Sequence, residues 1–81
     1  MFSAKVTGAF GSYLKRMREQ KGISQEKLAE HADLDRTYVS LLERGLRTPT
    51  LKTVFSMAEV LSVKPSAIMR ELEETIGFKL H

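Results

Sequence analysis

Helix-stop and helix-start signals recur so closely along this chain that only short helices fit between them. Gly22 and Gly45 can each end a helix in a left-handed conformation, and Pro65 suits the first position of another. Side chains that can cap a helix N-terminus stand at Ser24, Asp35 and Thr50. These signals divide the chain into segments of a few turns each.

Within the segments, apolar residues repeat at three- and four-residue spacings, which indicates one buried face per helix. In chain order, the residues expected to face inward are Phe10, Tyr13, Leu14 and Met17; Leu28, Ala29 and Ala32; Val39 and Leu42; Leu51, Val54, Phe55, Ala58 and Leu61; and Ile68, Met69 and Leu72. The pattern predicts an all-α protein, a compact bundle of five short helices; the apolar stripe of the first begins at Phe10, and Gly8 and Gly11 leave the start of that helix open.

The two ends of the chain follow a different pattern. Phe2, Ala4 and Val6 alternate with polar residues, and so do the apolar residues of 76–80. A period of two is typical of strands, so the termini are expected either to form short strands that pair, or to be frayed tails.

Length and composition argue against several classes of function. A chain of 81 residues predicts one domain, residues 1–81, with little chain left to wall a deep substrate pocket, so we expect no enzyme. The chain has no cysteine and two histidines, which argues against disulfides, metal sites and a metal cofactor. No apolar run approaches the roughly 20 residues of a membrane span, and no secretory segment is apparent. We therefore expect a cytoplasmic protein without cofactor or membrane contact.

Charge is segregated along the chain. Residues 1–22 carry five basic residues against one acidic, residues 23–35 carry one basic against four acidic, and residues 36–52 carry four basic against one acidic. This distribution fits a surface that faces a polyanion and is backed by an acidic surface, although solvated helix faces would explain it too.

Residues 24–44 fit a helix-turn-helix, two short helices joined by a tight turn. Ala29 is small where the second helix must cross the first, and Asp33 occupies the turn position that needs a left-handed conformation. The side chains expected to dock the second helix on the core are Leu34, Val39 and Leu42.

The chain resembles the lambda-repressor-like, Xre-type helix-turn-helix family of transcriptional regulators, and within it the small controller proteins of restriction–modification systems. The resemblance extends from about Tyr13 to Met69 and is most specific in GISQEKLA, in the ERG of Glu43–Gly45 and at Pro49–Thr50. Asp33 departs from the family's usual turn glycine. The resemblance implies a lambda-repressor-like fold and a dimer that binds double-stranded DNA.

The helix that starts at Asp35 is expected to enter the major groove with its first turns. Base-reading candidates on it and on the following loop are Arg36, Thr37, Ser40 and Arg47. An arginine can contact guanine through two hydrogen bonds, which makes Arg36 the leading reader. Phosphate-binding candidates are Ser24, Gln25, Tyr38, Arg44, Thr48, Thr50 and Lys52; Tyr38 could instead only pack, Thr50 only cap, and Arg44 only face solvent. The family resemblance implies the role of Gln25 and a structural ion pair between Arg18 and Glu43.

One such motif reads too few base pairs for selectivity, so we expect a homodimer on a near-palindromic operator. The interface is predicted within residues 65–81, at Ile68, Met69, Leu72 and Ile76, so that Leu72→Glu should give a folded monomer. Glu26 and Glu30 could contact RNA polymerase or simply aid solubility. The alternative function is a helical partner-binding protein, such as an antitoxin.

Overall fold

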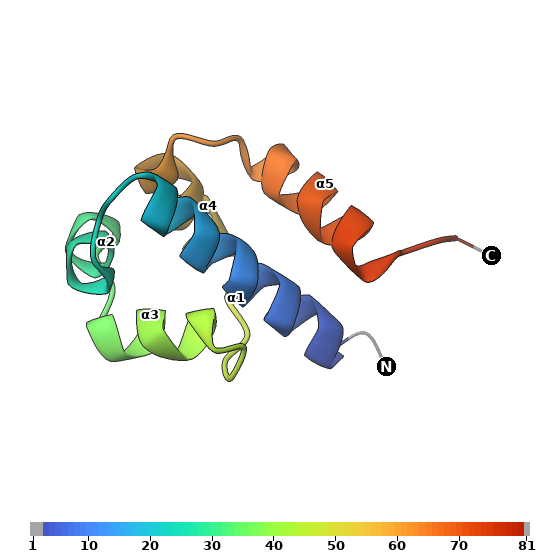
Figure 1. Ribbon diagram of the computed structural model, residues 1–81, viewed down its shortest axis with the longest axis horizontal. Helices are drawn as coiled ribbons and strands as arrows, with labels where there is room; N and C mark the ends of the chain where they lie inside the picture. The colour runs from blue at the N-terminus through green and yellow to red at the C-terminus, as the bar shows by residue number, and fades with distance from the viewer. Residues whose placement is uncertain (1–2, 81) are drawn as a thin grey trace.

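The computed structural model describes residues 3–80 and contains five α-helices with no strand among them (Figure 1). The helices are α1 (Ser3–Gln20), α2 (Gln25–Ala32), α3 (Arg36–Glu43), α4 (Leu51–Leu61) and α5 (Pro65–Ile76). The prediction of an all-α bundle of five helices is confirmed. No helix in the described range is long and apolar enough to cross a membrane.

The capping residues act as the sequence predicts. The Ser24 hydroxyl accepts a hydrogen bond from the Lys27 amide at 3.0 Å, the Asp35 carboxylate accepts one from the Thr37 amide at 3.1 Å, and the Thr50 hydroxyl accepts one from the Thr53 amide at 3.0 Å. Asp33 ends α2 with φ 57° and ψ 48°, the left-handed conformation expected at the turn. These local interactions set the lengths of α2, α3 and α4.

The first helix starts well before the apolar stripe that begins at Phe10. It starts at Ser3, so Ala4 and Val6 lie in a helix and not in a strand. Ile76 is likewise the last residue of α5, and residues 78–80 form no strand; Phe2 lies outside the described residues. The reason is tertiary packing, because the extended α1 contacts both α3 and α5, and this packing outweighs a short alternating pattern.

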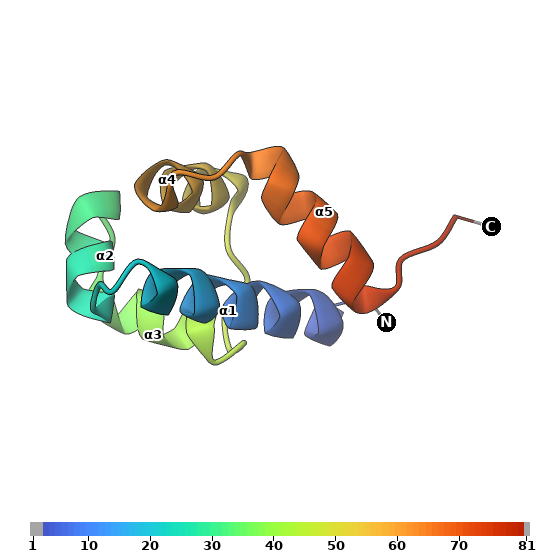
Figure 2. The ribbon, with the colours of Figure 1, turned by 45° about the horizontal axis from the view of Figure 1, so that its top comes forward.

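The core forms around α1, which runs through the middle of the molecule with α3 on one side and α5 on the other (Figure 1). Figure 2 shows α2 and α4 at one end, where α2 packs against both α3 and α4. The largest fully buried side chains come from all five helices: Phe10, Leu14, Leu28, Val39, Leu42, Met57, Leu61 and Ile68.

A glycine allows the close approach of α1 to α3. A Cβ atom at Gly11 would lie 2.7 Å from the carbonyl oxygen of Glu43, closer than real Cβ contacts come. Any side chain at this position would therefore push α3 away from α1.

Three of the residues expected to face inward are exposed instead: Leu51, Phe55 and Met69. Leu51 and Phe55 do not face inward: they are 76% and 59% exposed, because the buried stripe of α4 runs through Val54, Met57, Ala58 and Leu61. Phe55 follows Val54 by one residue, which turns its side chain about 100° around the helix.

The predicted dimer surface is also partly wrong. Ile68 is fully buried and Leu72 is 7% exposed, so both belong to the core of a single chain. Only Met69, which is 44% exposed, and the half-buried Ile76 remain available to a partner. This burial does not fit the expectation that Leu72→Glu leaves a folded monomer, because the substitution would place a charge in the core.

Candidate nucleic-acid interface

α3 has two sharply different sides. Val39 and Leu42 are fully buried and hold the helix against the core. Arg36 and Thr37 are exposed, and Ser40 is half-buried. The helical spacing places these three polar residues together on the outer surface of the first two turns. They form a compact polar face in which an arginine and two hydroxyl groups can donate and accept hydrogen bonds.

The loop after α3 folds back onto that helix. The guanidinium carbon of Arg47 lies 5.3 Å from the ring centroid of Tyr38, a distance at which a cation–π interaction holds the two groups together. Tyr38 is half-buried and also packs against the core. The structure thus brings Arg47 beside α3, a contact that no local pattern in the sequence indicates.

The ion pair expected between Arg18 and Glu43 is present and largely buried. Arg18 Nε donates to Glu43 Oε2 at 2.6 Å and Nη2 donates to Oε1 at 3.1 Å, while Nη1 donates to the carbonyl oxygen of Ile23 at 2.8 Å. The side chains are 12% and 3% exposed. The hydrogen bonds to Glu43 raise the pKa of Arg18 although burial opposes them, so the arginine stays charged at working pH. The pair joins the end of α1 to the end of α3.

Gln25 is attached to the same carboxylate. Its Nε2 donates to Glu43 Oε1 at 2.9 Å, so one buried carboxylate receives both the arginine and the first residue of α2. The amide nitrogen carries a second hydrogen, which remains available to an acceptor at the N-terminus of α2. Sequence reasoning placed Gln25 and Glu43 in separate roles and missed this link, because it joins residues far apart in the chain.

The remaining phosphate-binding candidates differ in their surroundings. Ser24, Arg44 and Thr48 are exposed. The Thr50 hydroxyl also donates to the Thr53 hydroxyl at 3.1 Å, so both its donor and its acceptor capacity serve the start of α4. Lys52 is exposed beside the α2–α3 turn, where it lines a hollow together with Asp33 and Leu34. The structure therefore places Arg36, Thr37 and Ser40 on one face of α3, brings Arg47 beside Tyr38, and leaves Lys52 beside the α2–α3 turn.

Sequence and structure both relate this chain to known helix-turn-helix proteins. Residues 14–68 match the Helix-turn-helix family. The control protein C.BamHI of Bacillus amyloliquefaciens is 39% identical over 61 residues, which cover 74% of this chain and 75% of that protein. The crystal structure of the restriction–modification controller protein C.AhdI from Aeromonas hydrophila is similar with a TM-score of 0.72 and 41% identity, covering 82% of this chain and 94% of that one.

A third relative was solved with DNA. The restriction–modification controller protein C.Esp1396I, as a tetramer in complex with its natural 35 base-pair operator, matches with a TM-score of 0.78 and 32% identity. The match covers 90% of this chain and 96% of that one. The resemblance seen in the sequence is thereby confirmed in both family and fold. The chain belongs to the Xre-like helix-turn-helix family of DNA-binding transcription regulators, with a lambda-repressor-like fold.

Proposed function

We propose that this chain is a single helix-turn-helix domain that binds a near-palindromic operator in double-stranded DNA as a homodimer and regulates transcription in the cytoplasm. The observation that carries the proposal is the two-sided α3, whose buried Val39 and Leu42 fix an outer face of Arg36, Thr37 and Ser40. This function requires no catalytic group and no cofactor.

Base reading is assigned to the outer face of α3 and to Arg47. The exposed Arg36 guanidinium can donate two hydrogen bonds to O6 and N7 of a guanine, a contact worth about 1–3 kcal/mol of discrimination. Thr37 and Ser40 are short enough to let the helix approach the base edges. The cation–π contact with Tyr38 holds Arg47 beside α3, next to the helix that is assigned to base reading.

Phosphate binding is assigned to both ends of the motif. At the N-terminus of α2, the first amide groups have no partner within the helix, and Gln25 adds the second hydrogen of its side-chain amide. Ser24, Arg44 and Thr48 supply further donors or positive charge. Thr50 contributes through the cap that orients α4 rather than through a spare hydroxyl hydrogen.

A homodimer is expected because one helix-turn-helix contacts too few base pairs to be selective. Two copies related by a two-fold axis place their recognition helices about one turn of DNA apart, roughly 34 Å, and read two half-sites. The tetramer of C.Esp1396I on its operator supports both DNA binding and self-association. A contact with RNA polymerase through Glu26 and Glu30 stays a prediction; both are exposed, and Glu30 lies 3.8 Å from Lys27 in an exposed ion pair.

The test is selection of random double-stranded DNA by the purified protein at about 50 and 200 mM salt, the range over which phosphate contacts weaken. Enrichment of a two-fold symmetric sequence, with weaker binding at the higher salt, is expected. Folded protein that enriches no sequence at either salt would refute the proposal and point to a partner-binding protein such as an antitoxin.

A further inference from the structure

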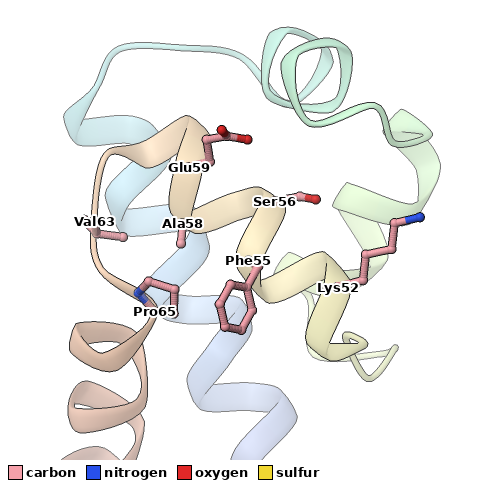
Figure 3. Close-up of a pocket in the computed structure, with 7 residues that line it drawn as sticks. All are labelled: Lys52, Phe55, Ser56, Ala58, Glu59, Val63 and Pro65. Carbon is pink, nitrogen blue, oxygen red and sulfur yellow. The ribbon is translucent and has the colours of Figure 1, made fainter.

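The outer side of α4 carries an apolar surface that the monomer does not cover. Leu51 and Phe55 are 76% and 59% exposed, and their spacing of four residues places them side by side on one face. Phe55 borders a hollow of about 500 Å³ that Val63 and Pro65 also line (Figure 3). An exposed apolar patch rimmed by polar residues is typical of a surface that binds another protein.

Two opposite charges flank this surface along the helix. Lys52 and Glu59 lie two turns apart on the same side of α4, with Phe55 and Ser56 between them (Figure 3). Both are exposed, and within residues 3–80 neither forms an ion pair. We define the α4 face as Leu51, Lys52, Phe55, Ser56 and Glu59.

The order of these charges makes the α4 face complementary to itself. If two copies of α4 pack antiparallel about a two-fold axis between Phe55 and Ser56, Lys52 of each copy lies opposite Glu59 of the other. The two Phe55 side chains then meet at the axis. A contact of this kind pairs residue i with j and j with i, which is the rule for a two-fold homodimer.

We propose that the α4 face is where a second copy of this chain docks, with the two α4 helices antiparallel. This inference rests on the proposed function and specifies its dimer. Leu51 directly follows the loop that carries Arg47 and Thr48, so a two-fold axis at the α4 face places the two DNA-facing loops on either side of it. Neighbouring half-sites require that arrangement.

A second apolar surface lies where α1 and α5 meet, and it is less suitable as a dimer interface. Val6, Met69, Ile76 and Phe78 line it together with Glu73, its one charged lining residue among those described. The residues that line it offer no pair of opposite charges for a two-fold contact. The α4 face, in contrast, supplies both signs.

The experiment compares Phe55→Glu with Met69→Glu by sedimentation equilibrium without DNA, since both side chains are exposed in the monomer. Wild type and Met69→Glu are expected to sediment at twice the 9.2 kDa chain mass, and Phe55→Glu at the chain mass itself. Far-UV circular dichroism establishes that each variant keeps its helices.

Charge reversal supplies a second, independent test. Lys52→Glu and Glu59→Lys should each weaken the dimer at least tenfold, and the double variant should restore most of the loss. A dimeric Phe55→Glu, a monomeric Met69→Glu, an unrescued double variant or a monomeric wild type would each overturn the α4 face. Selection of a symmetric DNA sequence by wild type, despite a dimeric Phe55→Glu, would leave the proposed function intact and move only the interface.

Discussion

The buried pair of Arg18 and Glu43 allows a quantitative test of how the recognition helix is held. We consider Arg18→Met, Glu43→Met and the double variant, because methionine is unbranched and similar in length to both side chains. Removing one partner of a buried ion pair costs about 3–5 kcal/mol, because the other charge stays buried without a counter-charge. Arg18 is 12% exposed and Gln25 still bonds Glu43, so each single variant should lose about 3 kcal/mol, the lower end of that range.

The double variant should lose less stability than the two single variants lose together. With both charges gone, the remaining defects are the Ile23 carbonyl and the Gln25 amide, which lose their partners at about 1–1.5 kcal/mol each. The double variant is then about 2–3 kcal/mol less stable than wild type, and the coupling between the two positions is about 3–4 kcal/mol. A domain of this length has about 4–12 kcal/mol of stability in total, so the single variants should still fold.

The assay is urea unfolding followed by far-UV circular dichroism, with thermal melts in parallel. A loss of about 3 kcal/mol corresponds to a fall of about 12–24 °C in melting temperature for a domain of this size. The pKa of Arg18 is raised, so the contribution of the pair is complete below the unfolded arginine value and is lost only as the pH rises through the higher folded value. The coupling should therefore be the same at pH 6 and pH 8. Losses that add in the double variant would refute the assignment of a mutually dependent buried pair.

Three further predictions concern the DNA-facing residues and the packing of α1. Arg36→Ala should relax base preference at one or two operator positions by about 1–3 kcal/mol each, measured by repeating the DNA selection; an unchanged preferred sequence would contradict the assignment. Tyr38→Ala should weaken operator binding about as much as Arg47→Ala, and the double variant should bind no more weakly than either, because one contact is lost in all three. Tyr38→Phe keeps the ring and should bind like wild type. A binding titration with operator DNA measures each affinity. Gly11→Ala should destabilise the fold by about 1–3 kcal/mol in urea unfolding, while Gly8→Ala, whose Cβ meets nothing within 4 Å, should not; equal effects would argue against the close α1–α3 contact.

The parts of this fold that depend on neighbouring residues could be predicted from the sequence. Ser24, Asp35 and Thr50 cap helices because each bonds an amide two or three residues ahead, an interaction contained within one turn. The left-handed Asp33 is equally local, since the turn geometry demands that conformation whatever lies beyond it.

The parts of the fold that depend on contacts between distant residues could not be predicted from the sequence. Phe55 has the spacing of an inward residue, yet the position of α5 and α2 determines which side of α4 is covered. The periodicity of α5 makes Ile68 an inward-facing residue but does not say whether it packs within one chain or against a second copy, and the packing of α5 on α1 shows that it is core. The Gln25–Glu43 and Arg47–Tyr38 contacts join different elements, so no periodicity within one helix indicates them.

The two-sidedness of α3 has a consequence for how such regulators diverge. The residues that hold the helix in place and the residues that face outward are different residues, since Val39 and Leu42 are buried whereas Arg36 and Thr37 are exposed. Substitutions at exposed positions away from caps and buried contacts usually change stability by less than about 0.5 kcal/mol. Gene duplicates of this chain could thus acquire new operators by a few outward substitutions while their folding remains unaffected, and two copies in one cell could soon regulate separate genes.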